Sequence, residues 1–187
     1  ENKTIIRRYA TITELFNTHF PTEERPYLVA QQGISLMKMN NRPLDFRIHT
    51  NKNIHGDWQV SAIAAKISGH NRVTTHLANG GIVKTIEELT QENESFRPYI
   101  QELQNATLQL SETLEEKIDG FNGEFGFDMG IDVHGHIWMF EANSKPGRAI
   151  FIHPKLKKED IATRKLPFEF GTYLTETIIT KPETVLT

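Results

Sequence analysis

Residues 123–148 carry the pattern that most restricts the fold of this chain: two runs of alternating polar and apolar residues on either side of His134-Gly135. A residue followed by glycine between two such runs is a typical signal for a β-hairpin. If the hairpin closes symmetrically at this turn, Asp128 on the first strand lies directly opposite Glu141 on the second. Opposite residues on paired strands share a face of the sheet, so the pattern predicts that the two carboxylates lie side by side.

The alternation assigns a face to each residue of this hairpin, in which the symmetric turn pairs Val133 with His136. The apolar face, which another layer has to cover, comprises Phe127, Met129, Ile131, Val133, Trp138, Phe140 and Ala142. The polar face comprises Asp128, Asp132, Glu141 and Asn143. Oxygen donors on adjacent strands, with no sulfur and no obligatory histidine, suit Mg²⁺ or Mn²⁺ far better than zinc. A solvated polar face at the edge of a sheet explains the same pattern equally well.

Cations follow these oxygen donors in the segment Lys145-Pro146-Gly147-Arg148. Carboxylates for a metal beside cations for phosphate are typical of a nucleoside-triphosphate site. A third cation, Lys66, lies inside the predicted strand 58–67. Its ammonium group needs an anionic partner or access to water, so Lys66 is either a phosphate ligand or the solvated end of a strand.

Hydrophobic periodicity predicts the remaining elements. Predicted strands cover residues 5–9, 27–32, 44–49 and 58–67, and predicted helices begin near residues 11, 85, 98 and 168. The helix over residues 98–118 has an apolar stripe and a Glu-rich opposite face, which is typical of a core helix. Gln31 and Gln32 end one predicted strand, where they either bind an adenine edge or satisfy backbone groups.

Composition excludes several classes of function. A net charge of −3 and a pI near 6.3 give no basic field for non-specific nucleic-acid binding. No apolar run reaches the length of a membrane span, and no signal-peptide pattern opens the chain. The absence of cysteine excludes disulfides, thiolate zinc sites and cysteine nucleophiles.

Motifs along the chain resemble those of one enzyme superfamily. The interval of thirteen residues between Asp128 and Glu141, the segment Glu-Ala-Asn-Ser-Lys-Pro-Gly and an upstream Asp-Phe-Arg together resemble the C-terminal half of an ATP-grasp ligase. Within that superfamily, the likeness is to the YheC/YheD-type endospore coat-associated ATP-grasp family. Further matching motifs are Gln31 to Ile34, Pro43 to Arg47, Gly56 with Trp58, and Gly80-Gly81.

The resemblance implies an α+β fold in which an antiparallel sheet packs with helices. Residues 1–34 would be the remainder of a small lobe and its hinge, and residues 35–187 would be the large catalytic lobe. The glycine-rich phosphate loop of such ligases has no counterpart before Tyr27. We therefore expect the amino-terminal part of the fold, with the other half of the nucleotide site, to precede Glu1.

Carried over position by position, the resemblance also implies a role for each matching residue. The ligands of the Mg²⁺ or Mn²⁺ that bridges the phosphates of ATP would be Asp128, Glu141 and Asn143. The residues that contact the nucleotide would be Gln31, Gln32, Gly33 and Ile34 at the adenine, with Lys145 and Arg148. Arg47 and Lys66 would face the phosphates or an acyl-phosphate, because ATP-grasp ligases first phosphorylate a carboxylate that an amine or a related nucleophile then attacks.

The function expected from the resemblance is an ATP- and magnesium-dependent carboxylate–amine ligase associated with the spore coat. The alternative is a catalytically silent structural or assembly protein of the coat that keeps the fold. Retention of all three metal positions favours the ligase. Expected partners are the nucleotide, a carboxylate or amine substrate that the sequence does not identify, and spore coat proteins, with no nucleic acid and no membrane. The expected location is the cytoplasm or the spore coat.

Overall fold

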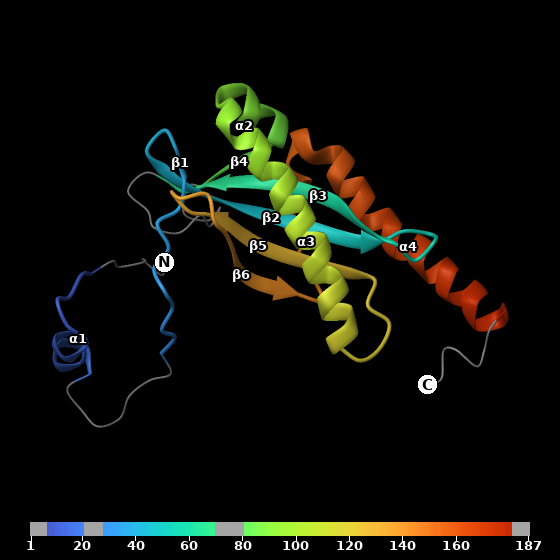
Figure 1. The fold of residues 1–187 in the computed structure, drawn as a ribbon, viewed down its shortest axis with the longest axis horizontal. Coiled ribbons are helices and arrows are strands. Elements are labelled where there is room, and N and C mark those ends of the chain that lie inside the picture. Colours follow the sequence, from blue (N-terminus) through green and yellow to red (C-terminus); the bar gives the residue numbers. More distant parts are fainter. Residues whose placement is uncertain (1–6, 21–27, 70–80, 181–187) are drawn as a thin grey trace. The chain divides into compact units, whose positions relative to one another are not determined.

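The computed structural model describes residues 7–20, 28–69 and 81–180 (Figure 1). The chain divides into two units, Glu1–Gly33 and Ile34–Thr187.

Over its described residues, the first unit contains one helix, α1 (Ile12–His19). Its N-cap is Thr11, whose hydroxyl accepts the amide of Glu14 at 3.1 Å. This bond satisfies one of the amides that have no partner inside the first turn of a helix. Residues 7–9 and 28–32 form no strand, so the two strands predicted in this unit are wrong over the described residues. Tyr27 and residues 5–6 lie outside the described ranges.

The second unit is built on a six-stranded sheet (Figure 1). Its strands are β1 (Lys38–Met39), β2 (Arg42–Lys52), β3 (Trp58–Ile67), β4 (Ile82–Lys84), β5 (Glu124–Ile131) and β6 (Ile137–Asn143). The order is β4-β3-β2-β5-β6, with β1 paired to β2, and every pairing is antiparallel. The predicted fold class, an antiparallel sheet packed with helices, is confirmed.

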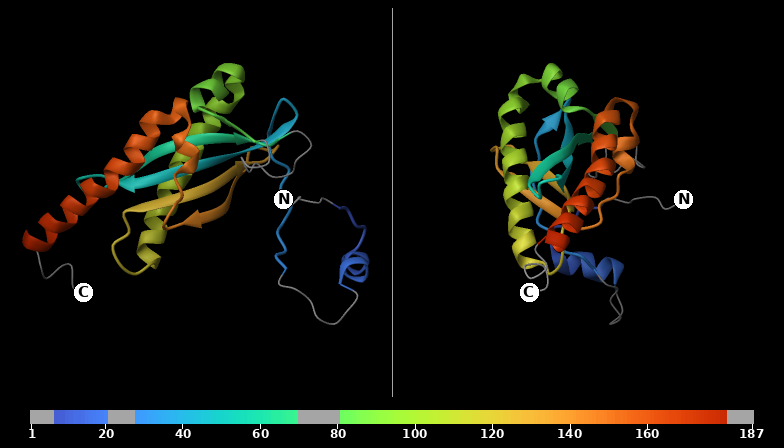
Figure 2. Two further views of the ribbon diagram at one scale, coloured as in Figure 1. Left: turned by 180° about the vertical axis from the view of Figure 1, so that it is seen from behind. Right: turned by 90° about the vertical axis from the view of Figure 1, so that its right-hand side faces the viewer.

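Helices cover both faces of this sheet (Figure 2). One face is covered by α2 (Ile86–Glu92), the 3₁₀ helix η2 (Glu94–Phe96) and α3 (Arg97–Lys117). The other is covered by the 3₁₀ helices η3 (Ala149–Ile152) and η4 (Pro154–Leu156) and by α4 (Lys157–Thr180). Among the described helices, none combines the length and the apolar character that a membrane crossing requires.

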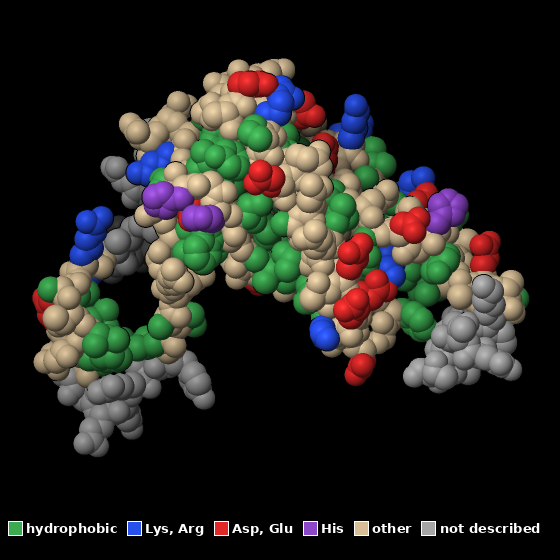
Figure 3. Space-filling view, viewed as in Figure 1, with side chains coloured by type: hydrophobic (Ala, Val, Ile, Leu, Met, Phe, Trp, Pro, Cys, Tyr) green, Lys and Arg blue, Asp and Glu red, His purple; other side chains and the backbone are tan. Residues whose placement is uncertain are grey.

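The main hydrophobic core lies between the sheet and α3. Every second residue of β2 and β5 enters it, because side chains alternate between the faces of a strand. The buried residues include Leu44, Phe46, Ile48, Phe125, Phe127, Met129 and Ile131 from the strands and Leu89, Phe96, Ile100 and Leu103 from the helices. Burying a side chain of this size contributes about 1.5–3 kcal/mol to folding. The predicted outer face of α3 is solvated, and acidic side chains gather over its C-terminal half (Figure 3).

The opposite face of the sheet has a smaller apolar core. It consists of Ala62, Ala64, Ile150, Phe151 and Leu156. The two alanines on β3 are short, and the intervening positions of β2 are polar. This face therefore has room for charged side chains beneath α4 and the segment that precedes it.

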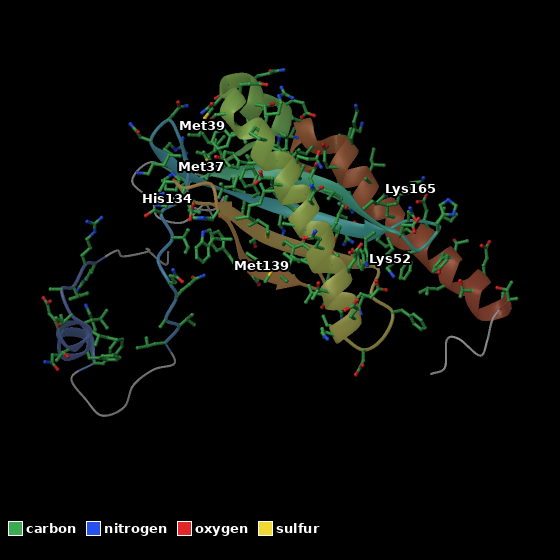
Figure 4. All side chains as sticks on the ribbon, in the orientation of Figure 1. Met37, Met39, Lys52, His134, Met139 and Lys165 are labelled. Atoms are coloured by element: carbon green, nitrogen blue, oxygen red, sulfur yellow. The ribbon has the colours of Figure 1, made fainter. Side chains whose placement is uncertain are left out.

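Lys52, labelled in Figure 4, links the two helical layers at one end of the sheet. Its ammonium group pairs with Glu115 of α3. The same group lies 5.4 Å from the ring centroids of both Trp58 and Phe170, the latter on α4. Trp58 in turn donates its indole N–H to Glu115 at 2.7 Å. This cation–π and ionic cluster fixes α3 and α4 to the same end of the β2–β3 hairpin.

Candidate functional site

A row of charged side chains crosses four strands on the face of the sheet opposite α3. Asp45 of β2 is paired with Lys66 of β3 in the strand register. Arg47, two residues further along β2, is paired with Asp128 of β5, which is in turn paired with Glu141 of β6. Directly paired residues share a face, so the register alone brings these five side chains together.

Ion pairs join the first four members of this row. Arg47 Nη1 donates to Asp128 Oδ2 at 2.8 Å, and Lys66 Nζ donates to Asp128 Oδ1 at 2.7 Å. Lys66 Nζ also lies 3.1 Å from Asp45 Oδ1. All four side chains are mostly buried, with exposed fractions between 11% and 20%. Lys66 is thus held by two carboxylates inside the protein, and the alternative of a solvated strand end is wrong.

Asp45 is a member of this row that sequence reasoning passed over. Its signal was present, because Asp45 and Arg47 are separated by two residues and therefore share a face of the strand. What was missing was the pairing of β2 with β3, which places Asp45 rather than another residue opposite Lys66.

The predicted metal ligands lie at the β6 end of the row. Asp128 is opposite Glu141, as predicted, and Asn143 is opposite Gly126, so all three share one face. Glu141 is exposed and Asn143 is half-buried. Within the described ranges no three His, Cys, Asp or Glu side chains are grouped to hold a metal. The donor set here is two carboxylates and one amide, all hard oxygen ligands, and it fits Mg²⁺ or Mn²⁺.

A β-bulge makes the pairing of Asp128 with Glu141 possible. Near the turn, Met129 is paired with Met139, Gly130 with Trp138 and Ile131 with Ile137. This register is one residue away from the symmetric closure. The register then shifts between Asp128 and Met129, so that Phe140 is the extra residue. The predicted pairing of Val133 with His136 is therefore wrong by one residue.

The bulge also changes which side chains share the apolar face. Trp138 is paired with Gly130 and so lies on the side opposite Met129, and the ring of Phe140 packs against Gly130. The prediction that both aromatic residues join the α3 face is wrong, because the bulge reverses the alternation along β6. Val133, predicted on the same face, is 57% exposed in the turn.

Asp132 is a buried turn residue, although the pattern placed it on the polar face of the hairpin with Asp128 and Glu141. Its carboxylate accepts the backbone amides of His134 at 2.8 Å and His136 at 2.9 Å, and the indole N–H of Trp138 at 3.0 Å. The bond from Trp138, with the two backbone amides, holds the pKa of Asp132 well below its ordinary value. Gly135 completes the turn with a φ of +87°, a conformation that favours glycine. Asp132 thus shapes the hairpin, and both of its carboxylate oxygens are engaged by partners within that hairpin.

The segment after β6 packs closely on the sheet. Pro146 is buried over Gly126, where an added Cβ would lie 2.3 Å from the Cβ of Pro146. Lys145 is exposed. Arg148 pairs with Glu124 of β5 and donates its Nε–H to the carbonyl of Thr163 on α4 at 3.2 Å.

A proline within α4 explains the last of these contacts. Pro167 has no N–H to give to the carbonyl four residues earlier, which is that of Thr163. The carbonyl is therefore available to Arg148. The structure gives Arg148 the role of a brace between β5 and α4, whereas its predicted contact with a nucleotide stays a prediction.

His49 lies beneath the segment that follows β6, next to Gly126, and is completely buried. Its ring meets that of Phe151 edge-on at 4.8 Å between centroids. Neither ring nitrogen makes a hydrogen bond of good geometry. Burial, together with the positive charges of Arg47 and Arg148, lowers the pKa of His49 from 6.5 to about 3, partly offset by the carboxylate of Asp128 and the backbone of Gly147. The imidazole is thus neutral at physiological pH.

The remaining predicted nucleotide contacts fall at the boundary of the two units. Gln31, Gln32 and Gly33 are exposed in the first unit and Ile34 is half-buried in the second. Gly80 of the Gly-Gly motif lies outside the described residues. An adenine pocket formed by Gln31 to Ile34 stays a prediction.

Comparison with known proteins finds similarity over nearly the whole chain. The model of the family described as YheC/D like ATP-grasp matches residues 1–174. Endospore coat-associated protein YheD of Bacillus subtilis (strain 168) is 48% identical over 172 residues, which are 92% of this chain and 37% of YheD. Endospore coat-associated protein YheC of the same strain is 22% identical over 142 residues, which are 73% of this chain and 38% of YheC. The chain thus spans less than two-fifths of the length of either relative.

Proposed function

Because the chain belongs to the YheC/D-like ATP-grasp family, we propose that it supplies the metal- and phosphate-binding wall of an ATP- and magnesium-dependent ligase. Membership confirms the resemblance inferred from Asp128, Glu141 and Asn143 with the Lys-Pro-Gly segment. The reaction would join a carboxylate to an amine or a related nucleophile through an acyl-phosphate. The observation that carries this proposal is the charged row across β3, β2, β5 and β6, which combines oxygen donors with cations on one face.

Each residue of the row has a task in such a reaction. Asp128, Glu141 and Asn143 would hold Mg²⁺, which when bound supplies positive charge next to the phosphate oxygens. Arg47 and Lys66 would bind the transferred phosphoryl group and stabilise the charge that develops on it. Their side chains are only 14% and 16% exposed, which keeps them largely out of bulk water, where the same charges would be screened. No covalent nucleophile from the protein is required.

The contacts around the row fix its backbone and the position of Lys66 before any ligand binds. Strand pairing sets the backbone of each member, and the ion pair with Asp45 holds Lys66 in place. The Pro146–Gly126 contact sets the position of the segment that carries Lys145. Rigid placement of this kind lowers the reorganisation that a phosphoryl-transfer transition state demands.

Spore coat association comes to this chain from the names of its relatives, and it supports a second candidate function. In this alternative the chain is a catalytically silent coat protein that uses the fold for assembly with other coat proteins. The favouring observation is that Asp128 has both oxygens occupied by Arg47 and Lys66. A purely structural ion-pair network would be arranged in this way.

Thermal unfolding with and without MgATP tests the proposed function. The sharpest version uses a polypeptide of the relatives' length that contains this sequence, because these residues cover under two-fifths of YheD. Ligand at about 100 times its Kd should stabilise the native state by roughly 2.7 kcal/mol. Asp128→Asn and Glu141→Gln should abolish the effect, whereas Glu112→Gln, a matched change on the outer face of α3, should leave it intact. The isolated 187 residues should show a weak shift or none.

The outcomes separate the two candidates. Absence of any MgATP-dependent shift in the longer polypeptide contradicts the nucleotide site, as does an equal shift in Asp128→Asn. A normal shift without phosphate release, across a panel of amino acids and peptides as acceptors, favours the silent coat protein. Phosphate release that depends on one acceptor class establishes the ligase and identifies its substrate.

A further inference from the structure

Asp128 divides its two oxygens between two cations. Oδ2 accepts Arg47 Nη1 at 2.8 Å, and Oδ1 accepts Lys66 Nζ at 2.7 Å. The cations differ in what else they contact. Lys66 has a second carboxylate, Asp45, at 3.1 Å. For Arg47, Asp128 is the one carboxylate partner found among the described residues.

This difference decides what happens if Asp128 is drawn into coordination of a divalent cation. Lys66 keeps an ion pair, because Asp45 stays opposite it in the β2–β3 register. Arg47 loses Asp128 as its partner, although its side chain is only 14% exposed. A mostly buried guanidinium without an anion is costly. The state in which Asp128 is engaged therefore favours an anion that approaches Arg47.

The converse holds when no cation is present. Arg47 is then neutralised by Asp128, and an incoming anion has to displace that carboxylate or pair with an arginine that is already satisfied. In the structure described above, the ion pair with Asp128 thus prevents Arg47 from attracting another anion. Asp45 has the separate task of retaining Lys66 in place in both states.

We infer that Asp128 is a switch that masks Arg47 until a divalent cation binds, so that binding of the cation and binding of the phosphate group are positively coupled. The inference rests on the proposed function, because it assigns the order of events at the same site. Asp45 is a positioning residue, since it acts on the site only through Lys66. Couplings of this kind between two ligands are commonly on the order of 10-fold in affinity.

Tripolyphosphate binding in the presence of EDTA tests this inference in the absence of metal. Asp128→Asn removes the masking charge, so the variant should bind tripolyphosphate about 10-fold more tightly than the unmodified chain. Glu141→Gln is the charge-matched control, because Glu141 lies on the same face and next to Asp128 in the register but has no ion pair with Arg47. Adding Arg47→Gln to Asp128→Asn should remove the gain.

Equal gains in Asp128→Asn and Glu141→Gln would overturn the inference, since general electrostatics would then explain the result. No gain in Asp128→Asn, or a gain that survives Arg47→Gln, would overturn it as well. This result is separable from the proposed function: MgATP-dependent stabilisation that persists while the tripolyphosphate experiment fails removes the switch and leaves the nucleotide site standing.

A second measurement uses the unmodified chain and does not depend on how the variants fold. Phenylglyoxal reacts with accessible, unpaired arginine, and mass spectrometry locates the product. Millimolar Mg²⁺ should accelerate modification of Arg47 several-fold, and Arg97, which is exposed and paired with Glu94 on η2, should be unaffected. A rate at Arg47 that is unchanged by Mg²⁺ would contradict the unmasking step.

Discussion

Replacement of His49 by leucine should remove a pH dependence of folding stability that the unmodified chain shows. His49 is fully buried, and its ring packs edge-on against Phe151. Among the described residues no carboxylate is bonded to its ring, and the charges of Arg47 and Arg148 oppose its protonation more than the carboxylate of Asp128 favours it. Protonation of His49 therefore favours the unfolded chain, in which the imidazole is solvated.

The size of this effect follows from the two pKa values of His49. In the unfolded chain its pKa is 6.5, and in the folded protein it is about 3. Because the folded-state pKa is lowered, stability is fully present above pH 6.5 and is lost as the pH falls from there towards 3. The loss is about 1.4 kcal/mol for each pH unit in this window, or roughly 2 kcal/mol at pH 5.

Above pH 6.5 the leucine variant should be at least as stable as the unmodified chain, because two unpaired ring nitrogens are replaced by apolar atoms. Urea unfolding, followed by the fluorescence of Trp58 and Trp138, measures the free energy of unfolding of the leucine variant and of the unmodified chain. The measurements are made at about half-unit steps between roughly pH 7.5 and 5, the range in which protonation of His49 should lower stability. His55→Gln, a change in the exposed turn after β2, is the control for histidine titration in general. A difference in stability between the leucine variant and the unmodified chain that stays constant over this range would refute the reasoning.

Two further substitutions test the contacts that shape the site. Gly126→Ala should lower the free energy of unfolding in urea by about 1–3 kcal/mol, because overpacking of a filled site costs this much. The new methyl group would lie 2.3 Å from Pro146 and 3.1 Å from His49. An unchanged free energy of unfolding would mean that the segment after β6 moves aside freely. Asp132→Asn should lower the midpoint of thermal unfolding and redshift Trp138 fluorescence, because the amide cannot accept every hydrogen bond that the carboxylate accepts. An unchanged midpoint and spectrum would show that the β5–β6 turn holds its shape without this carboxylate.

The hairpin that carries Asp128 and Glu141 was predictable, because it depends on a local turn between two alternating runs. The symmetric register assumed for it is one residue off near the turn, and the two carboxylates are paired because the bulge between Asp128 and Met129 compensates for that difference. The faces of Trp138 and Phe140 were not predictable in the same way, since a bulge leaves no mark in the alternation itself. The turn, held by Asp132, closes one residue away from symmetry, and the bulge between Asp128 and Met129 offsets this difference further along the hairpin.

The contacts of the charged row with β2 and β3 required tertiary information. Arg47 and Asp128 are 81 residues apart, so no local pattern states which of them pair. The sequence indicated that Lys66 needs an anionic partner, and the structure pairs it with Asp45 and Asp128, neither of which the sequence identified as that partner. The predicted contact of Lys66 with a phosphate stays a prediction. A buried cation predicts that a partner exists without identifying it.

Two strands predicted in the first unit illustrate the limit of apolar runs as evidence. The run over residues 27–32 has the composition of a buried strand, yet its described residues are exposed and irregular, with Val29 at 94% exposure. A strand needs a neighbour to supply hydrogen bonds and burial. Local sequence cannot provide either, and α1 was correctly predicted because a capped helix satisfies its own backbone.

Pro167 relates the rotation of α4 about its own axis to the position of the segment that follows β6. Consecutive residues of an α-helix are rotated by about 100° around its axis. The one carbonyl that the proline leaves open therefore faces Arg148 in a single helical phase, at an Nε–O distance of 3.2 Å. Insertion or deletion of one residue between Leu156 and Thr163 would turn this acceptor away from the guanidinium while leaving the helix intact. Pro167, which is not part of the charged row, thus determines which rotation of α4 allows its contact with Arg148, in the segment that follows β6.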